Sequence, residues 1–324
     1  MKVLFTADWH IKLGQRKVPK QWQKDRFHML VDELNKVEAD MLIIGGDLLD
    51  VADPSAEEIE LMFDLIAKLN KPTWIFDGNH EMVSKRVSVL ERFAAEITRC
   101  NGLVLHVGSV RSPAFDIISY PDLHKKWAPA DAKLCFTHVR AELPAHMKTQ
   151  PEVDLSLFDA YDLVIAGDLH DYKMSQKTEA GTPILYPGSP LSTSFHRSIP
   201  EETNGYFIID TDTLEHEWFE LKHLPHLIRN KVTSTDEMVG DDFHHVIYEL
   251  EGDIESLGKI KDSELLDKKI NTKVSKDAKL DLNDLEIEEE LDLYLNEVEG
   301  LDDAKRVRCI TRFSDVVKIK VGDL

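Results

Sequence analysis

Short apolar runs alternate with amphipathic segments through the first two thirds of the chain. Helical periodicity covers residues 25–37 and 55–69, and the second segment opens with a Ser55-Ala56-Glu57-Glu58 capping box. The apolar runs are short and rich in β-branched and aromatic residues, as buried strands are. They lie at residues 3–7, 41–44, 73–76, 103–107, 115–120, 134–137 and 163–166. This alternation predicts an α/β layered domain with helices outside the sheets.

The pattern changes after residue 200. Residues 206–210 and 217–221 read as a hairpin around Thr211-Asp212-Thr213, and residues 246–250 read as a further strand. We therefore predict a first domain at residues 1–200 and a smaller α+β capping domain at residues 201–258. Residues 259–324 are predicted to hold a polar connector, an acidic amphipathic helix at 284–298 and a terminal strand, which complete the cap or dock a partner.

Charge is distributed unevenly along the 324 residues, whose formal net charge is -21. Residues 201–324 hold 32 acidic against 16 basic residues, so the first 200 residues carry a net charge of only -5. The three cysteines form no C-x-x-C pair, which argues against a disulfide framework or a zinc finger. The apolar start is too short for a signal peptide or a spanning helix. We expect a soluble protein of the cytoplasm, with no membrane partner.

A basic strip occupies residues 12–26, where six Lys or Arg residues accompany the single acid Asp25. Such a strip suits a polyanionic substrate, although charge runs are often no more than solvated surface. The candidate contacts to such a substrate are Arg16, Lys17, Lys20 and Lys24.

Metal-ligand residue types follow five of the predicted strands. They are Asp8 and His10, Asp47, Asn79 and His80, His138, and Asp168 and His170. Carboxylate, amide and imidazole donors suit Mn²⁺, Fe²⁺ or Zn²⁺, and two ions about 3.5–4 Å apart can clamp a phosphodiester. Asp47 is the natural bridge, because Gly45 and Gly46 let the backbone turn tightly beneath the ions.

These segments, read in order as D-W-H, G-G-D-L-L-D, G-N-H-E, T-H and G-D-L-H, resemble the calcineurin-like metallophosphoesterases. More narrowly, with the following Y-P-G-S-P-L-S-T-S-F, they resemble the SbcD-like nuclease subunit of the double-strand-break repair complex and its bacteriophage relatives. The resemblance covers about residues 1–200. It implies a four-layer sandwich of two sheets flanked by helices, with a smaller α+β cap.

Position by position, the resemblance implies one metal held by Asp8, His10, Asp47 and His170. The second is held by Asp47, Asn79, His138 and the residue at position 168. His80 matches the family's catalytic histidine, which stabilises the transition state and protonates the leaving oxygen. Asp50 and Glu81 support the ligands from behind, and Ser189 lines the cleft.

Position 168 departs from the family pattern, which is G-H-x-H where this chain has Gly167-Asp168-Leu169-His170. An aspartate adds negative charge and ligates Mn²⁺ or Mg²⁺ well. Either the second site is retained with a harder metal preference, or it is weakened.

The resemblance implies a metal-dependent DNA exonuclease and endonuclease that cuts through a dimetal-bridged hydroxide, with two Mn²⁺ (or Mg²⁺) ions as cofactors. The partner would be an SMC-like, ABC-type ATPase, in DNA recombination, repair or end processing. It further implies a homodimer within a heterotetramer, formed through helices near residues 55–69 and 87–99, in the host cytoplasm if the chain is from a bacteriophage. The alternatives are a small-molecule phosphodiesterase or protein phosphatase on this scaffold, and a non-catalytic DNA-coupling subunit.

Overall fold

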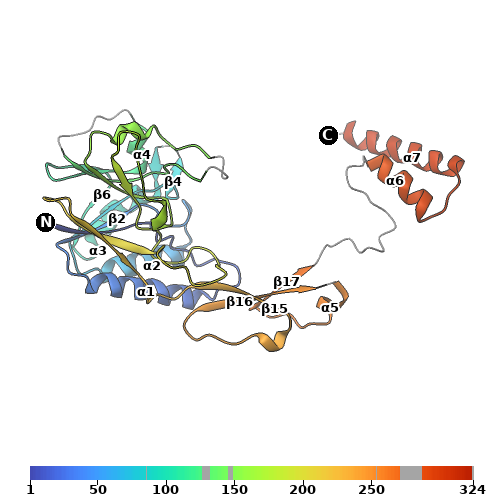
Figure 1. Cartoon of the computed structure of the whole chain (residues 1–324), viewed down its shortest axis with the longest axis horizontal. Helices are drawn as coiled ribbons and strands as arrows, with labels where there is room; N and C mark the ends of the chain where they lie inside the picture. The colour runs from blue at the N-terminus through green and yellow to red at the C-terminus, as the bar shows by residue number, and fades with distance from the viewer. Residues whose placement is uncertain (85, 126–131, 145–148, 253, 271–286, 323–324) are drawn as a thin grey trace. The chain divides into compact units, whose positions relative to one another are not determined.

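A computed structural model describes residues 1–84, 86–125, 132–144, 149–252, 254–270 and 287–322 (Figure 1). The chain divides into two compact units, Met1–Glu251 with Lys261–Lys269, and Gly252–Ile260 with Ile270–Leu324. The first unit holds every residue proposed above for the site. None of the described helices has the length and hydropathy that crossing a bilayer requires.

The first sheet has the order β14-β13-β1-β2-β3-β6 among the described strands. The strands β1, β2, β3 and β6 run parallel, whereas β13 and β14 are antiparallel additions at one edge. The bounds are β1 Lys2–Thr6, β2 Met41–Gly45, β3 Thr73–Phe76, β6 Val104–Val107, β13 Gly205–Asp210 and β14 His216–Glu220.

The second sheet has the order β11-β12-β10-β9-β8-β7 in the described part of the chain. Its four central strands are parallel, and its two edge strands are antiparallel. The bounds are β7 Val110–Arg111, β8 Asp116–Ile118, β9 Leu134–His138, β10 Leu163–Gly167, β11 Gln176–Lys177 and β12 Pro183–Leu185.

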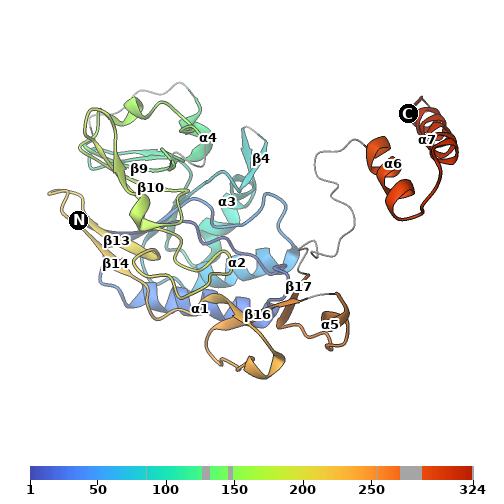
Figure 2. The same cartoon turned by 45° about the vertical axis from the view of Figure 1, so that its right-hand side comes forward.

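Strand periodicity explains how the layers form. In β1, Val3 and Phe5 face the second sheet, while Leu4 faces the helices, because successive side chains point to opposite faces. Phe5 stacks on Phe136 of β9 with ring centroids 5.4 Å apart, which joins the two sheets. Helices cover the outer face of the first sheet, and short helices cover that of the second (Figure 2). The former are α1 Lys20–Lys36, α2 Ala56–Lys68 and α3 Val89–Cys100, and the latter α4 Tyr120–Leu123, η2 Leu155–Phe158 and η3 Tyr172–Met174.

This arrangement confirms the predicted four-layer α/β sandwich. The capping box is present at Ser55 and Glu58, with α2 starting one residue later. Helix α1 begins at Lys20, five residues before the predicted start, because the chain turns at Pro19, which has the fixed φ of a proline and precedes the first helical turn.

Two features beyond residue 200 differ from the prediction. The hairpin β13–β14, expected as the start of the cap, pairs with β1 and completes the first sheet. The cap sheet consists of β15 Leu227–Val232, β16 His245–Gly252 and β17 Leu266–Ile270, and β17 lies inside the predicted connector. The remaining short elements are β4 Met82–Ser84, β5 Val87–Ser88, η4 Thr235–Glu237 and α5 Ile254–Gly258.

The predicted terminal strand is wrong, because the segment is a helix. α6 Ile287–Glu297 and α7 Asp303–Gly322 form a helical pair in the second unit. Asp302 accepts a hydrogen bond from Lys305 N at the start of α7, and Arg306 contacts Asp292 at 2.9 Å. These contacts override the β-branched residues near the end of the chain, since β-propensity depends strongly on context. Residues 271–286 of the predicted connector lie outside the described residues.

Candidate metal centre

The proposed ligands gather where strands of both sheets end. Asp8 and Asp47 follow β1 and β2 of the first sheet, and His138 ends β9 of the second. Asn79 follows β3, and Asp168 and His170 follow β10. Because β1, β2 and β3 are parallel, as are β9 and β10, their carboxyl ends meet at one edge of the sandwich.

Four ligand positions have the left-handed backbone conformation that non-glycine residues rarely adopt. Their φ values are 58° at Asp8, 50° at His10, 50° at Asp47 and 94° at Asp168. Such strain costs about 1–3 kcal/mol per residue and persists only where neighbouring contacts enforce it. Backbone hydrogen bonds provide these contacts, from Asp8 N to Gly46 O at 3.0 Å and from His10 N to Asp47 O at 2.9 Å. The strain therefore serves to aim the side chains.

Two glycines leave room for the ligands. A Cβ at Gly78 would lie 2.1 Å from Asp47 Oδ1, and a Cβ at Gly46, whose φ is 88°, would lie 2.3 Å from His138 Nδ1. Both distances are far below van der Waals contact. Any larger residue at either position would displace a ligand.

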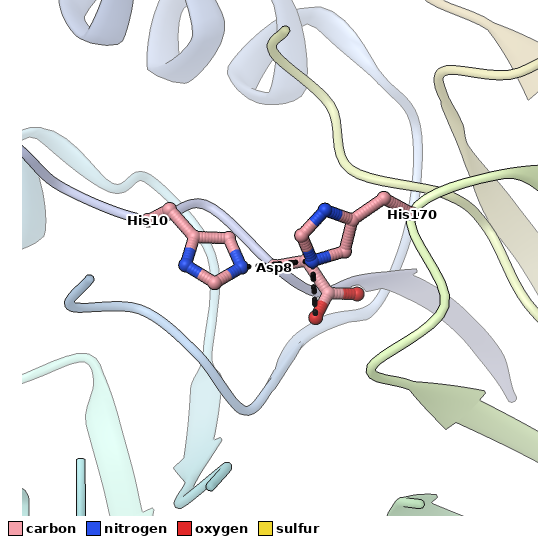
Figure 3. A group of neighbouring side chains, drawn as sticks. All are labelled: Asp8, His10 and His170. Atoms are coloured by element: carbon pink, nitrogen blue, oxygen red, sulfur yellow. Dashed lines mark hydrogen bonds and ion pairs between the residues drawn. The ribbon is translucent and has the colours of Figure 1, made fainter. Parts of the chain in front are cut away.

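One half of the centre consists of Asp8, His10 and His170 (Figure 3). His10 Nε2 lies 3.0 Å from His170 Nε2, and the latter lies 3.9 Å from Asp8 Oδ1. Burial and the nearby His10 lower the pKa of His170 to about 3, so this ring is neutral at pH 7 and has a lone pair to offer. Burial raises the pKa of Asp8. These three donors fit a divalent cation.

Asp47 lies between the two halves. Its Oδ2 is 3.6 Å from His10 Nε2 and 3.4 Å from His138 Nε2. Burial acts to raise the pKa of Asp47, but His138 and other imidazoles outweigh it and hold that pKa below its usual range. Among the described residues, Asp47 takes part in two groups whose possible ligand atoms lie within 4.8 Å of one another, one with His10 and His80 and one with Asp8 and His138. It is the carboxylate placed to be shared.

The other half consists of Asn79, His138 and Asp168. His138 Nδ1 lies 2.9 Å from the Gly45 carbonyl, which fixes the tautomer and turns Nε2 toward the site. The side-chain amide of Asn79 lies 3.0 Å from His138 Nε2, 3.0 Å from Asp47 Oδ2 and 3.3 Å from Asp168 Oδ1, and with its nitrogen turned toward them it donates hydrogen bonds to the two carboxylates. The amide thus joins the carboxylates and the imidazole of this half. Asp168, whose pKa burial raises, belongs to this half and does not point away from it.

The two supporting residues act in different ways. Asp50 contacts Lys12 Nζ at 2.6 Å and His10 Nδ1 at 3.3 Å, and although burial opposes them these groups lower the pKa of Asp50 to about 2. Glu81 is fully buried and accepts hydrogen bonds from the backbone N–H groups of Asp47, Leu49 and Gly78 at 2.8–3.1 Å. Burial and Asp47 raise the pKa of Glu81 to about 8. Glu81 therefore braces the ligand loops from behind.

His80 lies at the open side of the centre. Its side chain is 40% exposed, against 3% for His10, and its Nε2 lies 3.9 Å from Asp47 Oδ2. Its Nδ1 lies 2.6 Å from the Asp50 carbonyl, which orients the ring. His80 is thus held near both halves with one ring nitrogen available.

The predicted DNA contacts are scattered by comparison. Lys17 is bound to Leu266 O and to Asp267, and Lys20 pairs with Glu57 at 2.6 Å. Lys24 is half-buried, and Arg16 is exposed beside a cavity of about 240 Å³. Ser189 is 1% exposed, and its hydroxyl lies 2.7 Å from the Asp8 carbonyl. Its side chain holds the Asp8 loop, and Ser189 is also among the residues that line a cavity of about 430 Å³ together with His170.

The sequence did not indicate three residues beside the centre. Tyr120 of α4 places its ring 6.3 Å from the ring of His138 and donates its hydroxyl hydrogen to Glu152. Arg140 follows His138 by two residues, and that spacing was the only signal available for it.

Comparison with known proteins decides the family. Residues 1–172 match the calcineurin-like phosphoesterase family model. The chain belongs to the calcineurin-like phosphoesterase family. As the motifs predicted, it is a metal-dependent phosphoesterase, and its described donor groups fit divalent ions.

This phosphoesterase is also similar to a named nuclease component. It is 53% identical to the probable exonuclease subunit 1 of Escherichia phage T5, in an alignment covering 98% of this chain and 99% of the relative. Among solved structures, a novel archaeal phosphodiesterase is 14% identical with a TM-score of 0.38, covering 68% of this chain and 99% of that one. A hypothetical protein from Pyrococcus horikoshii OT3 is 12% identical with a TM-score of 0.36, covering 68% and 87% of the two chains.

Proposed function

We propose that this phosphoesterase is the nuclease subunit of a DNA-processing complex, and that it hydrolyses DNA phosphodiesters with two divalent metal ions. The observation that carries the proposal is the position of Asp47 between two groups of donor atoms, with His80 beside both. The phage T5 relative, named a probable exonuclease subunit, supports DNA as the substrate.

The residues that would hold the ions follow from the two halves. Asp8, His10 and His170 with Asp47 would hold one, and Asn79, His138 and Asp168 with Asp47 the other. Bound divalent ions neutralise the phosphodiester and lower the pKa of water. The second set contains two carboxylates and an amide oxygen, which favours Mn²⁺ or Mg²⁺ over softer ions.

His80 would supply the proton that the leaving oxygen needs. Its Nδ1 is oriented by the Asp50 carbonyl, so Nε2 is the nitrogen that faces the site and exchanges the proton. Glu81 and Ser189 keep the ligand loops in place from below. The chain's own part is thus to aim ligands, orient one acid and exclude bulk water from the buried donors.

A nuclease subunit acts with a partner protein, and the word subunit in the relative's name supports a partner for this chain too. We propose an SMC-like ATPase, as the motifs imply, acting in DNA recombination or repair with a dimer of this chain. The helical pair α6–α7 suits docking, because apolar side chains stand in solvent along it. They include Ile287, Tyr294, Val298 and Val307.

The test is release of nucleotides from linear double-stranded and single-stranded DNA by the purified protein with Mn²⁺, Mg²⁺ or chelator. His80→Gln should abolish release while metal content stays unchanged, and His216→Gln on the exposed start of β14 serves as the matched control. Hydrolysis of a small phosphodiester without cutting of DNA would instead identify a small-molecule enzyme. Inertness toward both, even with bound metal, would contradict the catalytic proposal for the isolated subunit.

A further inference from the structure

Arg140 is a half-buried cation at the end of β9 that is left without a counter-charge. Its Nε is buried and has no hydrogen-bond partner. In the part of the chain that the structure describes, no carboxylate lies within ion-pair distance of its guanidinium. Buried polar groups are nearly always paired in folded proteins, so such a nitrogen calls for a ligand.

The nearby acid Glu152 is already engaged. It accepts the hydroxyl hydrogen of Tyr120 at Oε1, and its Oε2 lies 3.5 Å from the backbone nitrogen of Arg140. The backbone nitrogen of Glu152 in turn donates to the Arg140 carbonyl at 2.9 Å. These contacts fix the backbone of Arg140 but do not involve its guanidinium group.

Arg140 lies beside the metal centre, two residues after His138 at the end of β9. Its backbone nitrogen is 3.5 Å from Glu152, which accepts the hydroxyl hydrogen of Tyr120, and the Tyr120 ring lies 6.3 Å from that of His138. Lys12, the cation beside the other half, differs in being paired with Asp50 at 2.6 Å. The half that contains Asp168 therefore has a nearby positive charge that no carboxylate side chain in the described residues pairs with.

We propose that Arg140 binds the phosphate group of the substrate on the Asp168 side of the centre. A planar guanidinium can offer two N–H groups to the non-bridging oxygens of a phosphate, which gives both attraction and orientation. Carboxylates line this site, so a cation that draws the anionic substrate in has a clear use. The inference rests on the proposed phosphodiesterase function and adds a substrate-binding residue to it.

The test compares Arg140→Gln and Arg140→Lys with Lys133→Gln in the full chain. Lys133 precedes the same strand, is 75% exposed and pairs with the exposed Asp162, so its substitution removes the same charge away from the centre. The readouts are the Kd for inorganic phosphate in the presence of Mn²⁺, the KM and kcat for a small phosphodiester and for DNA, Mn²⁺ affinity, and Tm.

Loss of a charged hydrogen bond predicts an increase of about tenfold or more in Kd and KM for Arg140→Gln, with kcat affected less. Arg140→Lys should recover part of the loss, because it retains charge without the paired donors. Lys133→Gln should match the wild type, and Mn²⁺ affinity should stay constant throughout.

An unchanged phosphate Kd in Arg140→Gln, or a loss explained entirely by a lower Tm or by lost Mn²⁺, would overturn the inference. The phosphate measurement needs no turnover. A wild-type protein that binds phosphate through Arg140 but cuts no DNA would therefore contradict the proposed nuclease and still support this residue's role.

Discussion

The metal centre and the α6–α7 helical pair reverse the usual places of polar and apolar side chains. In the centre, Asp8, Asp47 and His138 are at most 1% exposed. In the helical pair, no residue of described burial is buried, and Ile287 and Val307 are 65% and 62% exposed. Buried polar groups and exposed apolar groups are the two informative departures from ordinary burial. The first departure suits chemistry performed by the chain itself, and the second suits the partner docking that we propose.

The two regions also differ in what enforces their geometry. Around the centre, positive φ values at Asp8, His10, Asp47 and Asp168 are held by hydrogen bonds between loops far apart in sequence. In the helical pair, the described contacts span much shorter stretches of sequence, such as those of Arg306 with Asp292 and Asn296, which are 14 and 10 residues away. A change in the centre should therefore affect the reaction, whereas a change in the helical pair should leave it intact.

Asp47→Asn should have the largest effect, because it removes the carboxylate that we propose both halves share. We expect kcat for a small phosphodiester to fall by far more than the roughly 10–100-fold typical of outer ligand supports. Steady-state kinetics with Mn²⁺ measure this, and far-ultraviolet circular dichroism checks the fold. Asp212→Asn, at an exposed turn, is the matched control. A loss of less than tenfold would show that Asp47 is not shared.

A fall in pH should have an intermediate effect, which lowers the stability of the first compact unit through the buried His226. Its Nδ1 lies 2.9 Å from Ser192 Oγ, and burial together with His244 lowers the pKa of His226 to about 4. The folded pKa is below the unfolded value of about 6.5, so the contribution of His226 to stability is complete above pH 6.5 and is lost as pH falls toward 4. The loss should be on the order of 2 kcal/mol.

Urea unfolding followed by tryptophan fluorescence measures this loss of stability in the first unit, since every tryptophan precedes residue 219. His226→Gln should flatten the decline between pH 6.5 and 4.5. The helical pair has no histidine, so its ellipticity should not follow that decline. An unaltered pH profile in the variant would assign the decline to other groups.

Deletion of residues 287–324 should have the smallest effect on catalysis. The first unit contains all the proposed ligands, so the rate of hydrolysis of a small phosphodiester should stay within about twofold of that of the full chain. Capture of the proposed ATPase partner should be lost, as gel filtration of the mixed components would show. A large drop in kcat would mean that the helical pair also serves the reaction.

The sequence predicted the centre better than its surroundings, for a physical reason. Asp8, Asp47 and His138 each follow a strand whose own residues show where it ends, so local patterns placed them together. Ser189 and Glu81 act through hydrogen bonds to distant backbone atoms, and residue type gives no sign of such bonds. Arg140 was missed because a lone arginine has no pattern.

Pairing between distant segments explains the errors in the fold. β13–β14 reads correctly as a hairpin, but its pairing with β1 joins segments about 200 residues apart, which periodicity does not show. In α7, the local sequence favours a strand near the end of the chain, whereas packing against α6 selects a helix.

The central claim is that Asp47 serves two metal ions at once, and electron paramagnetic resonance of the protein titrated with Mn²⁺ tests it most directly. Our account predicts two ions per chain with the spectrum of an exchange-coupled pair, and loss of the coupling in Asp47→Asn. One ion per chain, or two that show no coupling, would contradict it.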